Sequence, residues 1–400
     1  MAPILKAESR IMNAPLDAPR SKDSPRVLEA PRPRNGHAPH SAPLPDSFPL
    51  YRGGVLHGAR IAYESWGRLN AARDNAILLF TGLSPSAHAA ATEADSSPGW
   101  WQRMIGPSLA IDTSRYFVIC VNSLGSCFGS TGPASIDPVS GLRYRLDFPE
   151  VAVEDLARAG YAAARALGIE RLAVAAGASL GGSVVTAFAA LFPQGARRLI
   201  SISGSAAASP FAIALRSVQR EAILRDPDWL GGNYAPDQPP RNGMRLARKL
   251  GTITYRSATE WRQRFGREAL ASVTAASLFA PRFAVEGYLE AQAERFTRVF
   301  DANCYLYLSL AMDRFDLAEH GGSYHHALSA AGEENGLEKA LVIGVESDML
   351  YPIHEQAAIA AAFEQAGVAT RFARLPSLEG HDAFLVDIPR FDAEIRAFLA

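Results

Sequence analysis

The sequence predicts an α/β fold in which a mostly parallel, doubly wound sheet carries an inserted helical cap. Short apolar runs alternate with helical patterns, one such run ends at a glycine-flanked serine, and a long helical stretch interrupts the alternation in the second half. The chain has 400 residues, which is enough to bury a large core under this arrangement.

The first 45 residues differ in composition from the rest of the chain. They are rich in Pro, Ala, Arg and Ser, and they show almost no periodic apolar pattern. Such a segment buries too little apolar surface to offset the entropy lost on ordering. We therefore predict a disordered N-terminal tail over residues 1–45.

The predicted strands are short and, in most cases, apolar throughout. An alternating segment at 60–64 predicts an edge or hairpin strand, whereas continuous apolar runs predict strands buried on both faces. The continuous runs lie at 76–80, 116–121, 172–176, 199–202, 340–343 and, more briefly, 371–375. Helical patterns separate them, most clearly at 151–167 and 181–192, and strands that alternate with helices indicate a parallel sheet.

Residues 205–330 break this alternation with mostly helical, aromatic-rich segments. We predict that they form a cap over the sheet edge where α/β folds bind their ligands. The core is accordingly predicted over residues 46–204 and 331–400.

The chain has 40 Lys and Arg residues and 41 Asp and Glu residues, so its positive and negative charges nearly balance. This balance argues against nucleic acid or an anionic membrane as a partner. No apolar run approaches the roughly 18 residues that span a bilayer. Cys120, Cys127 and Cys304 have no metal-like spacing and cannot all pair within the chain, which is typical of a reducing compartment. We expect a cytoplasmic protein that acts on small molecules and holds no metal.

The glycine-flanked serine is Ser179, between Gly177 and Gly181. A serine on a sharp strand-to-helix turn needs small neighbours, because the backbone passes too closely for larger side chains. The motif therefore predicts an exposed hydroxyl at a helix N-terminus, suited to nucleophilic attack. Taken alone, the same spacing also occurs in ordinary glycine-rich turns.

A nucleophilic serine needs a base and a group that orients the base, and in α/β hydrolases these follow in the order serine, acid, histidine. Asp348 follows the predicted strand 340–343, and His381 follows the last predicted strand. Glu346 is a rival acid, because side chains two positions apart on a strand point to one face. We favour Asp348, which lies on the loop proper.

Acyl transfer also requires hydrogen-bond donors for the oxyanion that forms when serine attacks a carbonyl. The residue after the nucleophile, Leu180, supplies one backbone N–H in this scheme. The loop after the strand 76–80 supplies the second, and we assign it to Leu83. The same loop is also compatible with an ordinary turn at Gly82.

Longer motifs are distributed over the chain from about residue 50 to the C-terminus. They are Tyr51-Arg52-Gly53-Gly54, Leu56-His57-Gly58-Ala59-Arg60, Thr81-Gly82-Leu83-Ser84, Gly99-Trp100-Trp101, Ile105-Gly106-Pro107, residues 120–127, 129–133, 219–223 and 253–257, and Gly380-His381-Asp382-Ala383-Phe384-Leu385. On these motifs the chain resembles the homoserine/serine O-acyltransferases of the α/β-hydrolase superfamily, and among them the serine O-succinyltransferase branch. It departs from the usual pattern at Leu180, where that family usually has methionine.

The resemblance implies transfer of an acyl group from coenzyme A to the hydroxyl of serine or homoserine through an acyl-enzyme. Ser179 would carry the acyl group, His381 would act as the base and Asp348 would orient it. The resemblance also implies an acyl-CoA co-substrate with no permanently bound cofactor, a homodimer built through cap helices, and a role in cysteine biosynthesis.

By the same resemblance, Arg220 binds the amino-acid carboxylate and Asp382 binds the ammonium group. Arg216 lies one helical turn before Arg220, where it can read the extra carboxylate of a succinyl donor. This favours succinyl-CoA and L-serine as substrates. Homoserine as the acceptor, an acetyl donor, and an esterase or thioesterase remain as alternatives.

Overall fold

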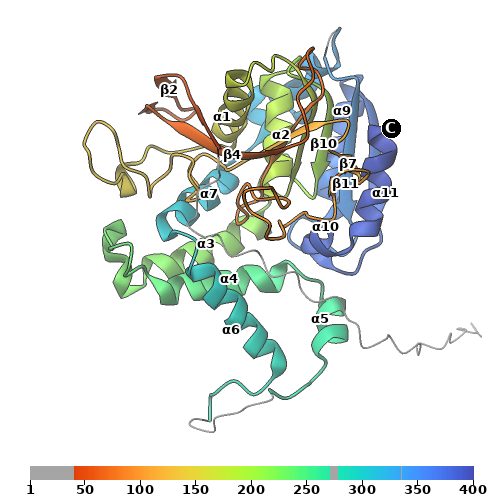
Figure 1. The fold of residues 1–400 in the computed structure, drawn as a ribbon. Coiled ribbons are helices and arrows are strands. Elements are labelled where there is room, and N and C mark those ends of the chain that lie inside the picture. The colour runs from red at the N-terminus through yellow and green to blue at the C-terminus, as the bar shows by residue number, and fades with distance from the viewer. Residues whose placement is uncertain (1–39, 271–277, 335) are drawn as a thin grey trace, which may run out of the picture.

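The computed structural model describes residues 40–270, 278–334 and 336–400, and it has one central sheet of eight strands in the order β1-β4-β8-β5-β9-β10-β11-β12 (Figure 1). β1 and β4 pair antiparallel, as do β4 and β8, and all the other neighbours are parallel. The bounds are β1 His40–Pro43, β4 Arg60–Trp66, β5 Ala76–Phe80, β8 Phe117–Val121, β9 Leu172–Ala178, β10 Ala196–Ile202, β11 Lys339–Val345 and β12 Ala369–Leu375. The predicted mostly parallel sheet is therefore present, and each predicted strand overlaps one of these.

The N-terminal boundary of the sheet differs from the prediction. β1 pairs with β4 from His40↔Tyr63 to Pro43↔Arg60, so the predicted tail ends too late, and ordered structure already includes residues 40–45. An edge strand tolerates Pro43 because one side of its backbone needs no hydrogen-bond partner. The proline-rich composition of this region therefore gave no indication of the strand β1. Residues 1–39 of the predicted tail lie outside the described residues.

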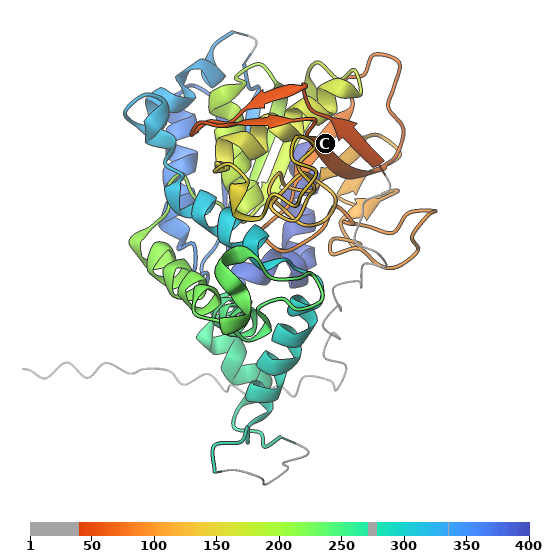
Figure 2. The ribbon, with the colours of Figure 1, turned by 90° about the vertical axis from the view of Figure 1, so that its left-hand side faces the viewer.

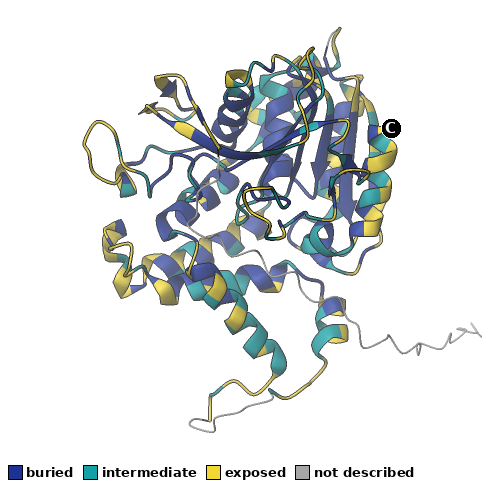
Figure 3. Ribbon diagram, in the orientation of Figure 1, coloured by how far each residue is buried: buried dark blue, intermediate teal, exposed yellow. Residues whose placement is uncertain are grey.

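Side chains of the central strands alternate between two hydrophobic cores. In β5, Leu78 and Phe80 belong to one core, whereas Ile77 and Leu79 belong to the other. The first core lies under α1 Val153–Ala166, α2 Leu180–Leu191 and α9 Ile353–Gln365, and the second lies under α10 Ala383–Val386 and α11 Ile388–Leu399. Both faces of the sheet are thus covered, and Figure 3 shows its central strands and α2 almost wholly buried.

The helices that follow β10, up to residue 314, lie at one end of the sheet, and the part of the chain with α4, α5 and α6 extends farthest from it (Figures 1 and 2). These helices are α3 Pro210–Leu224, α4 Arg241–Thr254, α5 Ala258–Phe265, α6 Ala284–Thr297 and α7 Ala302–Arg314. All five fall within the predicted cap, 205–330, and α4 packs against both α3 and α6. Their separation from the core as a domain stays a prediction.

The starts of the cap helices follow from local sequence. Ser209 caps α3 by accepting a hydrogen bond from the Ala212 N–H, and Pro210 takes the first helical position, where no N–H is needed. Asp301 caps α7 in the same way through the Cys304 N–H. These caps fix where α3 and α7 begin, and so which of their side chains face the sheet.

Smaller elements complete the chain. Two short two-stranded sheets pair β2 Ser47–Pro49 with β3 Val55–His57, and β6 Ile105–Gly106 with β7 Ile111–Asp112. The helix α8 Tyr324–Leu328 packs against α9. Within the described ranges, no helix has the length and apolar character needed to cross a bilayer.

Candidate active site

Ser179 lies on the turn between β9 and α2, at the carboxyl end of the central strands. Its backbone has φ 58° and ψ −122°, a conformation that costs energy for any residue other than glycine. A Cβ atom on Gly177 would clash with the Gly181 backbone, and one on Gly181 would clash with the Phe80 backbone. The small residues predicted around the serine are therefore required by the packing of this turn.

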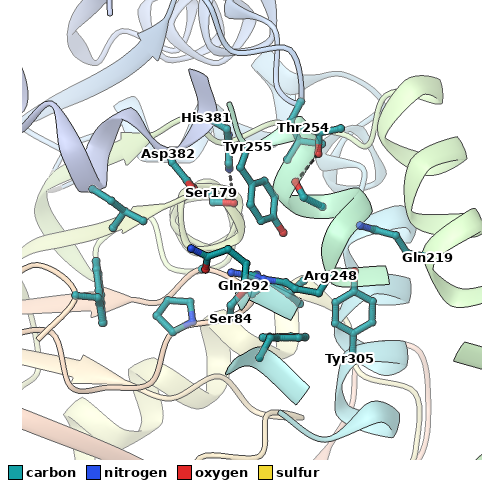
Figure 4. A pocket seen from close by; sticks show the side chains of 18 of the residues that line it. Ser84, Ser179, Gln219, Arg248, Thr254, Tyr255, Gln292, Tyr305, His381 and Asp382 are labelled. Carbon is teal, nitrogen blue, oxygen red and sulfur yellow. Dashed lines mark hydrogen bonds between the residues drawn. The ribbon is translucent and has the colours of Figure 1, made fainter. Parts of the chain in front are cut away.

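The structure brings Ser179, His381 and Asp348 together from three different loops. The His381 Nε2 lies 2.8 Å from the Ser179 Oγ (Figure 4). Its Nδ1 lies 2.7 Å from an Asp348 carboxylate oxygen. The second Asp348 oxygen accepts the backbone N–H groups of Leu350 and Tyr351, each at 2.9 Å. In the tautomer with Nδ1 protonated, the imidazole donates to Asp348 and accepts from the serine hydroxyl.

The environment of His381 favours its protonated form. Burial by itself lowers the pKa of the imidazole, but the carboxylates of Asp348, Asp382 and Glu355 together outweigh it, so the pKa of His381 lies above its usual value. A histidine that takes the serine proton becomes an imidazolium, and these carboxylates stabilise that ion.

The rival acid has a different partner. The Glu346 side chain is half exposed and lies 3.8 Å from Arg374, so the structure brings Asp348 rather than Glu346 to His381. His325 and His326 stack on each other, and His354 lies in the first turn of α9. Across residues 40–270, 278–334 and 336–400, no three His, Cys, Asp or Glu side chains form a group that could hold a metal ion.

The two predicted oxyanion donors lie beside Ser179. Leu180 begins α2 directly after the serine. The loop that contains Leu83 passes close by, because a Cβ atom on its neighbour Gly82 would lie 3.7 Å from the Ser179 Cβ. Both N–H groups lack a hydrogen-bond acceptor in the described part of the chain, so both are free to bind an oxyanion.

A cavity of about 580 Å³ opens over these residues, within the size range of small-molecule sites. Its floor includes Ser179, His381 and the loop with Leu83. Its opposite wall comes from the cap, with Gln219 from α3, Arg248 from α4, Gln292 from α6 and Tyr305 from α7 (Figure 4). Arg216 from α3 also lines the cavity.

Asp313 on α7 holds both arginines that the sequence places on α3. The Arg216 Nε lies 2.5 Å from one Asp313 oxygen, and the Arg220 Nη2 lies 2.5 Å from the other. Arg216 also donates to the Tyr351 hydroxyl at 3.2 Å, while its buried Nη2 has no hydrogen-bond partner in the described structure. Arg216 lines the cavity, whereas Arg220 is absent from its lining and instead contacts Ser309.

Arg248 is a cavity residue that the sequence reasoning missed. Its guanidinium donates to the Ser84 hydroxyl at 3.1 Å and lies 4.7 Å from the Phe296 ring centroid and 5.5 Å from that of Tyr255. No carboxylate pairs with it in the described residues, and its Nε is buried without a partner. Helix α4 is rich in basic residues, so composition does not distinguish Arg248 from its neighbours. The one sequence signal is its spacing from Tyr255, which lies two helical turns later on the same face.

Comparison with known proteins gives the family of the chain. Residues 75–387 match the model of the alpha/beta hydrolase fold. The chain is 57% identical over 352 residues to a serine O-succinyltransferase of Litchfieldella anticariensis, a match that covers 88% of this chain and 95% of that relative. Among solved structures, it is similar to a homoserine O-acetyltransferase from Bacillus anthracis, with a TM-score of 0.82, 28% identity and coverage of 90% and 96% of the two chains.

The chain belongs to the homoserine/serine O-acyltransferase family of α/β hydrolases. The predicted fold class and the predicted resemblance are both confirmed. The esterase E22 has nearly the same fold, with a TM-score of 0.81, 27% identity and coverage of 90% and 99% of the two chains. Since this fold serves acyltransferases and esterases alike, the side chains around the cavity have to explain where the acyl group goes.

Proposed function

We propose that the protein transfers a succinyl group from succinyl-CoA to the hydroxyl of L-serine. The observation that carries this proposal is the cavity itself, in which Ser179 and His381 face two arginines, Arg216 and Arg248, across a small space. The two substrates bring one carboxylate each to the reacting centre, the succinyl carboxylate and the α-carboxylate of serine. High identity to proteins named serine O-succinyltransferase supports the same substrates.

The first half-reaction acylates Ser179. The Ser179 Oγ gives its proton to the His381 Nε2 and attacks the thioester carbonyl carbon, and the N–H groups of Leu83 and Leu180 bind the oxyanion. The tetrahedral intermediate then breaks the carbon–sulfur bond, and the departing sulfur takes the proton from His381. Free coenzyme A leaves, and a succinyl ester remains on Ser179.

The second half-reaction moves the succinyl group to the amino acid. The hydroxyl of L-serine gives its proton to His381 and attacks the ester carbonyl carbon. The intermediate breaks its bond to the Ser179 Oγ, which recovers the proton from His381. The products are O-succinyl-L-serine and the free enzyme.

Each substrate group has a counterpart of opposite charge in the cavity. In our proposal Arg216, which lines the cavity, binds the succinyl carboxylate, and Asp382 binds the ammonium group of serine. The resemblance assigns the serine carboxylate to Arg220, but Arg220 is held by Asp313 and Ser309 outside the cavity lining. We therefore assign that carboxylate to Arg248, which has no carboxylate partner in the described chain.

The cap gives a reason for transfer in place of hydrolysis. An acyl-enzyme that admits water loses its acyl group, so a transferase has to restrict water until the acceptor arrives. Side chains from α3, α4, α6 and α7 cover Ser179 in this way. An esterase or thioesterase is the alternative function for the same three residues, because the structurally similar protein E22 is an esterase.

The proposal also includes a homodimer and a step in cysteine biosynthesis. The cap exposes apolar side chains on α3 and α4, including Phe211, Val218, Leu246 and Ile253, and such a surface suits a homodimer interface. O-succinyl-L-serine is an activated ester whose β-carbon accepts sulfur, which fits a cytoplasmic step of cysteine biosynthesis.

A matrix of two donors and two acceptors tests the proposal. The protein is incubated with succinyl-CoA or acetyl-CoA and with L-serine or L-homoserine, while free thiol and the acylated amino acid are measured. We expect the highest kcat/KM for succinyl-CoA with L-serine. Thiol release at the same rate without any amino acid would instead identify a thioesterase.

A further inference from the structure

We infer that Arg256 is a positioning residue for the acceptor amino acid, acting through Asp382. This inference rests on the proposed function, because it concerns the carboxylate that we assign to the ammonium group of serine. Arg256 itself is absent from the cavity lining and is 6% exposed, so it lies behind the site and does not face it.

Both ion pairs of Arg256 lead to the loop that carries His381. Its Nη1 lies 3.1 Å from a Glu379 carboxylate oxygen, and its Nε lies 3.5 Å from an Asp382 oxygen. Glu379 and Asp382 flank Gly380 and His381 in the sequence. One buried cation thus pairs with the carboxylates on both sides of the catalytic histidine.

The backbone around Arg256 fixes the cap to the same loop. The Asp382 N–H donates to the Tyr255 carbonyl at 3.0 Å, and the Ser257 hydroxyl donates to the Leu378 carbonyl. A Cβ atom on Gly380 would lie 2.8 Å from the Arg256 carbonyl carbon, so the two backbones are in direct contact. These contacts hold His381 in place whatever the side chain at position 256.

The side chain of Arg256 therefore has a narrower role than its backbone. Without the guanidinium, the carboxylates of Glu379 and Asp382 would lose their shared buried partner, and their mutual repulsion would move Asp382 from its present position. Acylation of Ser179 uses no ammonium site and keeps the Asp348 carboxylate that contacts His381, whereas attack by serine depends on the ammonium site. Loss of the Arg256 charge should therefore weaken the second half-reaction and spare the first.

The ping-pong scheme lets the two half-reactions be measured separately. The acylation rate comes from the burst of free thiol with succinyl-CoA alone, and the KM for L-serine comes from steady-state turnover. For Arg256→Met we expect a KM for L-serine raised about tenfold or more, with an acylation rate within about twofold of the parent. Arg256→Lys keeps the charge and should recover part of the KM.

Arg264→Met is the matched control. Arg264 lies on α5, pairs with Glu260 and stacks on Tyr288, away from the cavity lining, so this variant should change neither quantity. Asp382→Asn combined with Arg256→Met should raise the KM for L-serine no further than Asp382→Asn alone, because both changes remove the same positioned carboxylate.

The outcomes separate the inference from the function on which it rests. An unchanged KM in Arg256→Met, an equal loss in both half-reactions, or additive losses in the double variant would overturn the role of Arg256. Absence of any thiol burst in the unaltered protein would instead overturn the proposed function, and the inference with it.

Discussion

Replacing Arg216 by glutamine tests how the cavity chooses its acyl donor. The change removes the cation whose buried Nη2 has no partner in the described structure, and it leaves Asp313 paired with Arg220 alone. Glutamine retains part of the side-chain volume. The succinyl group loses its charged partner, whereas an acetyl group has no carboxylate to lose.

The size of the effect follows from the kind of contact that is lost. A hydrogen bond to a charged group contributes about 1.5–3 kcal/mol. That range corresponds to a loss of roughly 10- to 150-fold in kcat/KM for succinyl-CoA. Any general damage from disturbing Asp313 and Tyr351 lowers both donors alike and cancels in the ratio of their kcat/KM values.

The assay is therefore the ratio of kcat/KM for succinyl-CoA to that for acetyl-CoA, at saturating L-serine, in the parent and in Arg216→Gln. We expect the ratio to fall by at least about tenfold. A ratio that does not change would refute the assignment of Arg216 to the succinyl carboxylate, even if both rates fall.

Three further predictions concern the nucleophile, the base and a buried acid. Ser179→Ala should form no covalent adduct with succinyl-CoA by intact-protein mass spectrometry, and an adduct that persists would identify another nucleophile. His381 has to be neutral to accept the serine proton and its pKa lies above the usual value, so kcat/KM for succinyl-CoA should fall as pH drops, with its midpoint above about 6.5. A midpoint at or below that value would contradict the effect of the surrounding carboxylates. Burial raises the pKa of Glu355 to about 7, so the fold favours its neutral form and loses stability as pH rises between the unfolded and folded pKa values. The unfolding temperature of Glu355→Gln, measured relative to that of the parent, should therefore increase as the pH is raised from about 5 to about 8. A difference that stays constant would show that Glu355 does not titrate in this range.

The sequence was sufficient for seven of the eight strands of the sheet and for bringing the three residues of the candidate catalytic site together. Ser179, Asp348 and His381 each follow a strand of one parallel sheet, and the carboxyl ends of such strands meet at the same edge. The order of the strands and the positions at which they end therefore predict that these side chains lie near one another. The prediction does not require the packing between helices to be known.

The substrate arginines depend on side-chain direction and on partners far away in the chain. Arg216 and Arg220 are one helical turn apart, and only the position of Asp313, 97 residues after Arg216, decides how the two guanidinium groups are held. Arg248 faces the cavity because α4 packs between α3 and α6, and no local pattern records that packing. The strand β1 was missed for a similar reason, since its pairing with β4 lies outside its own sequence.

Transfer of the acyl group from Ser179 to an amino acid is tested most directly by a chase experiment. The protein is mixed with succinyl-CoA, freed of coenzyme A, and then given L-serine or buffer while the mass of the Ser179 peptide is followed. We predict a succinyl ester on that peptide that disappears rapidly with L-serine, yielding O-succinyl-L-serine, and slowly with buffer. Equal decay in both samples, with free succinate as the product, would contradict the account.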